Sequence, residues 1–199
     1  MFDSINAYYK FHSKIYDLTR WSILFGRNNI LKQLPKFQDK DLSILELGCG
    51  TGHHLKKLAD FYPESRILGV DNSEDMIKRA FRKISGNDQV EVKRISCQKF
   101  LPKKEKYDLI FCSYSMSMFG DYHEFLIRIN ESLKSDGTIV AVDFDRSPFT
   151  MFEKWMKWNH VDISGDLFKQ LRLLFKEQTY ETKKAYLGLW EYSFFLGRK

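Results

Sequence analysis

The segment from Leu45 to Gly52, Leu-Glu-Leu-Gly-Cys-Gly-Thr-Gly, combines a carboxylate with three closely spaced glycines. Glu46 stands two residues before Gly48, and Gly50 and Gly52 follow at alternate positions. Glycines let the backbone turn sharply and approach a ligand, because no Cβ intervenes. The spacing G-x-G-x-G differs from the G-x-G-x-x-G of dinucleotide sites and disfavours a nicotinamide oxidoreductase. A carboxylate beside such a turn suits an ammonium group better than a pyrophosphate.

A second carboxylate follows at the end of the next apolar run. Asp71 comes nineteen residues after Gly52 and closes the run 66–70, which has the character of a buried strand. A carboxylate in that position can accept hydrogen bonds from both hydroxyl groups of a ribose. Glu46 and Asp71 together favour a nucleoside ligand that also carries an ammonium group.

These residues must be positioned by elements that alternate along the chain. Strands are expected at 42–47, 66–70, 90–95, 107–112, 137–143, 178–186 and 189–197. Helical periodicity is found at 3–33, 53–62, 74–84, 121–133, 149–158 and 164–175. The alternation predicts an α/β fold of three layers, with helices on both faces of a doubly wound, mostly parallel sheet. The last two strands are joined too tightly around Gly188 to be parallel neighbours, so one is expected to run antiparallel.

Glu46 with the glycine triplet, followed by Asp71, resembles class I S-adenosylmethionine-dependent methyltransferases, whose first motif reads E/D-x-G-x-G-x-G. The resemblance implies a Rossmann-like sheet of seven strands with an antiparallel last strand. It also implies S-adenosylmethionine as cofactor and S-adenosylhomocysteine as product. The residues that it places in the cofactor site are Glu46, Gly48, Cys49, Gly50, Gly52, Asp71, Asn72, Met76, Ser96, Cys97 and Ser113. Many such enzymes end the third strand with Asp, whereas Ser96 and Cys97 stand here, so adenine contact is expected from Ser96 or a backbone amide.

A narrower resemblance is carried by Ile-Tyr-Asp-Leu-Thr-Arg-Trp at 15–21, by Leu-Phe-Gly-Arg at 24–27 and by Ser-Tyr-Ser-Met-Ser-Met at 113–118. These stretches are similar to the bacterial betaine-lipid synthase methyltransferases, although the proline that follows the third stretch in that family is absent here. That family trimethylates the amine of diacylglyceryl-homoserine, so the resemblance implies N-methylation of a lipid head group. The alternatives are a soluble acceptor, such as a quinone precursor or an amino-acid derivative, and a non-catalytic cofactor-binding module.

Aromatic side chains are the first candidates for the acceptor site. A quaternary ammonium product is stabilised over aromatic faces. The family-like stretches supply Tyr16, Trp21 and Tyr114 for such a cage. An aromatic residue at helical spacing can instead belong to the core, an alternative that stays open for Trp21 above all.

Polar residues supply the other acceptor-site candidates. Asp143 is expected at the carboxyl end of a strand, where ligands gather in such sheets. Arg20 and Arg27 could hold a carboxylate or phosphate, because guanidinium groups bind such anions bidentately. Arg20 could instead pair with Asp17 on one helix face. His160 could take an amine proton, although packing or capping is the simpler interpretation.

The 199 residues are predicted to form a single methyltransferase domain, 1–199. Its expected parts are an N-terminal helical lid at 1–36, a cofactor-binding core at 40–145, a helical acceptor-side segment at 146–176 and a strand pair at 177–199. Bulky aromatic residues and lysines in the acceptor-side segment suit peripheral contact with an anionic membrane. The alternative is that the aromatic residues cap the sheet and the lysines are solvated.

Composition narrows the remaining classes. The net charge of +6 favours anionic partners, but no block of five like charges appears, so nucleic acid is not expected. Three cysteines without C-x-x-C spacing, and no signal peptide, predict reduced thiols in a cytoplasmic protein, at most peripheral to the inner membrane face. No metal site is predicted, and His53 and His54 are expected to be exposed. The oligomeric state is not predicted.

Overall fold

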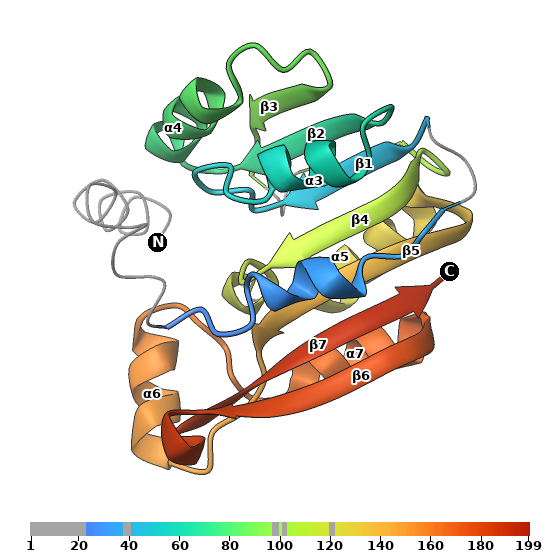
Figure 1. Cartoon of the computed structure of the whole chain (residues 1–199). Helices are drawn as coiled ribbons and strands as arrows, with labels where there is room; N and C mark the ends of the chain where they lie inside the picture. Colours follow the sequence, from blue (N-terminus) through green and yellow to red (C-terminus); the bar gives the residue numbers. More distant parts are fainter. Residues whose placement is uncertain (1–22, 38–40, 97–99, 101–102, 120–121) are drawn as a thin grey trace.

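The computed structural model describes residues 23–37, 41–96, 100, 103–119 and 122–199. Strands and helices alternate along the described chain (Figure 1). The strands are β1 (Ser43–Leu47), β2 (Arg66–Asp71), β3 (Val90–Arg94), β4 (Tyr107–Ser113), β5 (Leu133–Phe144), β6 (Lys176–Ala185) and β7 (Trp190–Arg198). The α-helices are α3 (Leu55–Phe61), α4 (Glu74–Ile84), α5 (Tyr122–Ser132), α6 (Thr150–Trp158) and α7 (Asp166–Leu174). The 3-10 helices are η1 (Asn29–Gln33), η3 (Met116–Met118) and η4 (Tyr186–Gly188).

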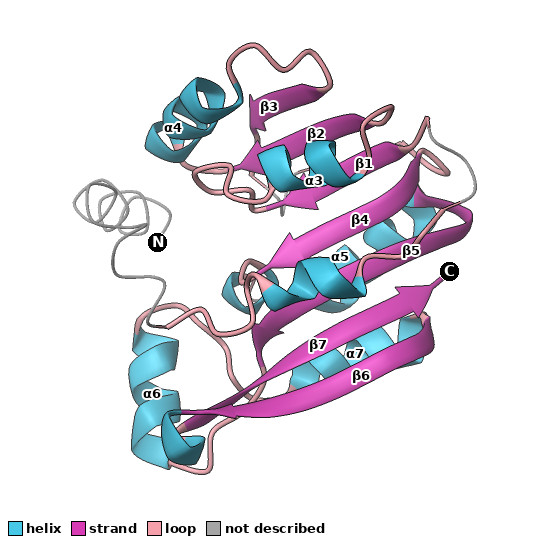
Figure 2. Ribbon diagram, in the orientation of Figure 1, coloured by secondary structure: helices cyan, strands magenta, loops and turns pink. Residues whose placement is uncertain are grey.

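The seven strands form one sheet in the order β3-β2-β1-β4-β5-β7-β6 (Figure 2). The pairs β3–β2, β2–β1, β1–β4 and β4–β5 are parallel. Strand β7 lies between β5 and β6 and is antiparallel to both. The predicted doubly wound, mostly parallel sheet with an antiparallel last strand is confirmed. The strand order reverses between β1 and β4, which is where ligands bind at the carboxyl ends of such sheets.

Apolar side chains cover both faces of the sheet. On one face, Leu55 and Leu58 of α3 pack in a cluster with Ile44 of β1. On the other, α5 and α7 pack against a cluster that contains Leu45 and Leu47. Figure 1 shows η1 and α3 in front of the sheet and α5 and α7 behind it. The alternation along β1 turns Glu46 toward the face that α3 covers.

The segment before β1 differs from the prediction of a helix over 3–33. Within its described part, from residue 23 onward, the helical structure is the short η1. Gly26 has a φ of +76°, and a Cβ there would lie 2.5 Å from Cζ of Phe194. The backbone at Gly26 therefore passes close to β7 in a left-handed conformation, which a right-handed helix cannot contain. Residues 1–22 lie outside the described part of the chain.

Two further boundaries differ from the sequence pattern. Strand β5 begins at Leu133, directly after α5, instead of at Gly137. Helix α3 begins at Leu55 instead of at 53, because the turn after β1 continues to His54. Among the described residues, no helix is both long and apolar enough to cross a bilayer.

Candidate functional site

The turn after β1 brings backbone close to other chain segments and leaves one position open. Gly48, Gly50 and Gly52 all have positive φ angles, of 69°, 54° and 74°. A Cβ on Gly48 would lie 2.4 Å from Cβ of Ser115, so the turn fits only because that atom is absent. A Cβ on Gly50 would meet no protein atom within 4 Å. The space over Gly50 is where a ligand can approach the backbone.

Asp71 at the end of β2 ties this turn to the start of α4. Its Oδ2 accepts a hydrogen bond from Gly50 N at 2.9 Å, and its Oδ1 accepts one from Ser73 N at 2.8 Å. Ser73 in turn caps α4, as its hydroxyl accepts from Met76 N. Desolvation raises the pKa of Asp71, while the N–H groups of Ser73 and Gly50 oppose that rise. Each carboxylate oxygen retains acceptor capacity for a ribose hydroxyl.

Glu46 is buried and makes contact with one histidine. Its Oε1 lies 3.4 Å from Nδ1 of His54, and the side chains are only 2% and 1% exposed. The Nε2 of His54 donates to the carbonyl oxygen of Arg27 at 2.8 Å. The prediction that His54 is exposed was therefore wrong. The other carboxylate oxygen, Oε2, is buried without a hydrogen-bond partner among the described residues. A buried, orphaned acceptor is the feature that an ammonium group of the cofactor requires.

Tyr114 follows β4 and connects it to the segment before β1. Its φ is +53°, and its hydroxyl donates to the carbonyl oxygen of Phe25 at 2.5 Å. Its ring meets that of Phe144 edge-on at 4.8 Å. Desolvation raises the pKa of Tyr114 well above its usual value, so the phenol remains a hydrogen-bond donor. The neighbouring Ser113 has a buried hydroxyl without a partner in the described structure.

Asp143 near the end of β5 is completely buried. Its Oδ2 accepts from Met116 N at 2.9 Å and from Ser117 N at 3.1 Å, and its Oδ1 accepts from Phe144 N at 2.9 Å. Burial raises its pKa to about 6 against the opposing effect of these bonds. The carboxylate that the sequence placed near the acceptor thus fixes η3 in the loop after β4.

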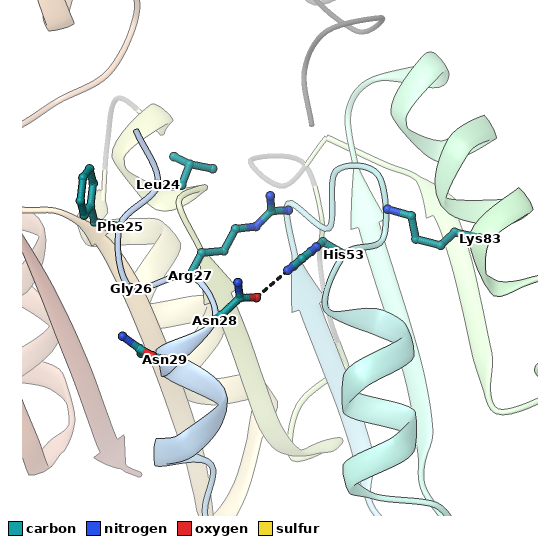
Figure 3. Close-up of a pocket in the computed structure, with 8 residues that line it drawn as sticks. All are labelled: Leu24, Phe25, Gly26, Arg27, Asn28, Asn29, His53 and Lys83. Carbon is teal, nitrogen blue, oxygen red and sulfur yellow. Dashed lines mark hydrogen bonds between the residues drawn. The ribbon is translucent and has the colours of Figure 1, made fainter. Parts of the chain in front are cut away.

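A pocket of about 500 Å³ lies beside the glycine turn (Figure 3). Its lining residues are Leu24, Phe25, Gly26, Arg27, Asn28, Asn29, His53 and Lys83. The ring of His53 donates from Nε2 to Oδ1 of Asn28 at 2.9 Å. Burial, followed by the charges of Arg27 and of other nearby basic groups, lowers the pKa of His53 to about 3. The described residues that line the pocket carry a positive net charge from Arg27 and Lys83, and His53 is neutral at physiological pH.

The structure brings some predicted residues to this edge of the sheet and not others. Met76 is buried at the start of α4, Asn72 is half-buried beside Asp71, and Ser96 is half-buried two residues after β3. His160 is exposed, with φ +60°, and its N–H bonds to Lys157 O at the end of α6, a capping position outside the pocket. Four predicted residues lie outside the described part of the chain: Tyr16, Arg20, Trp21 and Cys97.

Sequence reasoning missed the contact of His54 with Glu46 and the role of Asn28 and Lys83 in the pocket. A signal existed for His54, since it precedes the buried Leu58 by one helical turn.

Cys49 and Cys112 are buried, as expected for cysteines at strand ends. No group of three or more His, Cys, Asp or Glu side chains within the described ranges is arranged to hold a metal ion.

Residues 38–189 match the family model for a methyltransferase domain. The malonyl-[acyl-carrier protein] O-methyltransferase of Acetivibrio thermocellus is 31% identical over 123 residues, which are 62% of this chain and 43% of that protein. The corresponding enzyme of Priestia megaterium is 27% identical over 144 residues, 69% of this chain and 50% of that protein. The trans-aconitate 2-methyltransferase of Deinococcus radiodurans is 27% identical over 98 residues, 49% of this chain and 36% of that protein. The chain spans about half or less of the length of these three relatives.

Solved structures show the same fold at low sequence identity. Geranyl diphosphate C-methyltransferase from Streptomyces coelicolor A3(2), in complex with S-adenosyl-L-homocysteine, superposes with a TM-score of 0.75 at 13% identity, over 86% of this chain and 74% of that one. A Haemonchus contortus phosphoethanolamine N-methyltransferase, in complex with S-adenosyl-L-methionine, gives a TM-score of 0.72 at 15% identity, over 87% and 52%. The curated relatives named above are not betaine-lipid N-methyltransferases. The comparisons therefore support the broader resemblance and not the narrower one.

The geometry fits the cofactor of this family. The orphaned Oε2 of Glu46 suits its ammonium group, the space over Gly50 suits close approach to the backbone, and Asp71 suits its ribose. The family model covers residues 38–189, a range that includes the glycine turn and six strands of the sheet. The chain belongs to the methyltransferase domain family.

Proposed function

We propose that this protein is an S-adenosylmethionine-dependent methyltransferase that methylates an oxygen of a carboxylate-bearing acceptor. The observation that carries the proposal is the pocket beside the glycine turn, whose described lining residues include Arg27 and Lys83 and no acidic side chain. An anionic acceptor is attracted to such a pocket, whereas an ammonium group is repelled. The relatives named for malonyl-[acyl-carrier protein] and for trans-aconitate support the proposal, since both of those acceptors carry a carboxylate.

The chemistry of a carboxylate acceptor suits the residues present. When bound, S-adenosylmethionine supplies a methyl group on a positively charged sulfur. A carboxylate is already ionised at neutral pH, so the site needs no general base. His53 is neutral, but its ring nitrogen is hydrogen-bonded to Asn28. Asp143 is buried and accepts hydrogen bonds from three backbone N–H groups, so neither residue is available as a base. An anion and a sulfonium give two neutral products, so exclusion of water and correct orientation favour transfer.

We assign the cofactor contacts as follows. Glu46 binds the ammonium group through Oε2, and Asp71 binds the ribose. Tyr114 and Asp143 act as positioning residues, because one holds the segment before β1 and the other holds the loop after β4. The cofactor's own carboxylate is a second anion that the pocket could hold, and the test must separate the two.

A lipid amine is the second candidate acceptor. Its support is the Ser-Tyr-Ser-Met-Ser-Met stretch, which forms the end of β4 and η3, together with exposed aromatic side chains on α6. The charge of the pocket opposes it. The two candidates differ in the bond that is formed, which makes them separable.

The test uses the full chain with methyl-labelled S-adenosylmethionine. The acceptors are a malonyl carrier protein, trans-aconitate and an amine-headed lipid. We expect base-labile label, the mark of a methyl ester, on one of the carboxylates. Base-stable label on the lipid amine would overturn the proposal. Calorimetric binding of S-adenosylhomocysteine in the same preparation shows separately that the cofactor site is intact.

A further inference from the structure

Helix α6 turns large apolar side chains toward solvent. Met151, Trp155 and Trp158 are 86%, 51% and 79% exposed. Their spacing of four and three residues puts them in one stripe along the helix. The helix is held to the sheet by its other side, where the ring of Phe152 stacks on Trp190 at 5.4 Å and 10°. Within the stripe, Trp155 also contacts Phe152, with the ring centroids 5.6 Å apart, whereas Met151 and Trp158 are the more exposed members.

The turn between β6 and β7 continues this apolar surface. Leu187 is fully exposed, and Tyr186 is about half exposed. Both residues have positive φ angles, of 56° and 43°, which non-glycine residues rarely adopt. Phe149, which precedes α6, lines a pocket of about 360 Å³ together with Leu187. Six residues make up what we call the α6–η4 surface: Phe149, Met151, Trp155, Trp158, Tyr186 and Leu187.

Basic side chains accompany the α6–η4 surface. Lys154 and Lys157 are exposed on α6, and Lys184 is exposed at the end of β6. Arg146 is paired with Glu191 at 2.6 Å. Over residues 146–158 and 184–191 the sequence carries four basic and two acidic side chains, so the surface has a positive net charge. Its charge complements an anionic partner.

We propose that the α6–η4 surface docks this protein on an anionic lipid bilayer. Exposed tryptophans beside lysines are typical of helices that lie at the membrane interface, where the rings reach the acyl boundary and the ammonium groups reach lipid phosphates. Protein interfaces, by contrast, are depleted in lysine. The surface ends in the projecting Leu187, which suits insertion into a deformable bilayer more than docking on a rigid protein.

The docked orientation has a consequence for the active site. Helix α6 follows the carboxyl end of β5, and β5, β4 and β1 are parallel, so their carboxyl ends share one edge of the sheet (Figure 1). Docking through the α6–η4 surface turns this edge, with the glycine turn, toward the bilayer. The proposal does not depend on which atom of the acceptor is methylated.

The test is sedimentation of the full chain with vesicles. We expect binding to phosphatidylcholine vesicles that contain phosphatidylglycerol, with a blue shift of tryptophan emission. Binding weakens as salt is raised, because exposed charges are screened. Pure phosphatidylcholine binds less protein. Absence of binding to the anionic vesicles at low salt overturns the proposal.

Matched variants locate the contact. Lys154→Glu with Lys157→Glu reverses two charges and is expected to weaken binding by roughly tenfold or more. Trp155→Ser with Trp158→Ser is expected to abolish most of the blue shift. Leu173→Ser on α7 is the matched control, because Leu173 is 84% exposed but lies outside the α6–η4 surface. We expect this variant to bind vesicles as the wild type does. Equal loss of binding in the Leu173 variant contradicts the proposal.

Light scattering and a carrier-protein titration exclude other occupants. Circular dichroism checks the fold of every variant, and we expect these substitutions of exposed residues to leave it intact. If the wild-type chain is a dimer that the tryptophan variant dissociates, without vesicle binding, the surface belongs to a second copy of the chain. If it binds an acidic carrier protein and not vesicles, the partner is a protein. Either result overturns membrane docking.

Discussion

The Nδ1 atom of His54 lies 3.4 Å from Oε1 of Glu46, and Nε2 of the same ring lies 2.8 Å from the carbonyl oxygen of Arg27. A carbonyl oxygen only accepts, so Nε2 carries a hydrogen. The contact between Nδ1 and the carboxyl is then attractive only if a proton lies between them, on the ring or on the acid. His54 thus connects the segment before β1 to the carboxylate that we assign to the cofactor's ammonium group.

Replacement of His54 by Ala is expected to weaken binding of S-adenosylhomocysteine. Glu46 loses its partner in a buried site, which costs about 1–3 kcal/mol, or about five- to 150-fold in affinity. Calorimetry measures the change. Methylthioadenosine, which lacks the ammonium group, should lose little affinity. An equal loss for both ligands would show that the variant only distorts the turn. His123→Ala on the exposed side of α5 is the control.

Alanine at Gly48 and at Gly50 should have different effects, although both residues have positive φ angles. At Gly48 the new Cβ meets Ser115, so we expect loss of several kcal/mol of stability in denaturant unfolding. At Gly50 the Cβ enters open space, and backbone strain of about 1–2 kcal/mol is the cost. The Gly50 variant should fold yet bind S-adenosylhomocysteine poorly. Unchanged binding there would contradict our placement of the cofactor.

Asp143 should give the protein a pH-dependent stability of unusual sign. Its pKa is about 6 in the folded state against an ordinary 3.8, so its contribution is fully present below about pH 4 and is lost as the pH rises through 6. Asp143→Asn lacks this titration. The variant should be less stable throughout, because its amide nitrogen faces backbone donors. Its deficit in the free energy of unfolding should shrink between pH 5 and 7.5. A growing deficit would contradict the raised pKa.

Arg27→Gln tests the anion pocket directly. If the guanidinium holds the acceptor's carboxylate, KM for that acceptor should rise by about tenfold or more, the range for a charge-assisted hydrogen bond. Affinity for S-adenosylhomocysteine should be unchanged. The reverse pattern, weaker cofactor binding with the same KM, would assign the pocket to the cofactor's own carboxylate. Arg82→Gln, an exposed arginine near the end of α4, is the matched control.

The sequence predicted the elements whose signals are local. Ser73 before two acidic residues predicted the start of α4, and the structure confirms the cap. Apolar runs predicted the central strands β1, β4 and β5, because strands buried on both faces need little beyond such runs. The segment near Gly26 was missed, since its path depends on contact with Phe194, which is distant in sequence.

The cofactor side of the site was also accessible to sequence reasoning, because its residues follow one another in a short motif. The pocket was not. It is formed by contacts such as that of His53 with Asn28, which join the segment before β1 to the turn after it. Tyr114 and Asp143 lie near strand ends, as predicted, while their part in the reaction stays a prediction. Their hydrogen bonds to the segment before β1 and to the loop after β4 depend on contacts distant in sequence, which the motif alone does not reveal.

The place of β7 has a consequence for how the protein is made. The strand formed by Trp190–Arg198 is inserted between β5 and β6, so the sheet stays divided until those residues have left the ribosome. Until then, β5 exposes an unpaired apolar edge in the middle of the molecule. Strand β6 can therefore join the sheet only through β7, which makes the pairing of β5 with β7 the step that completes the sheet.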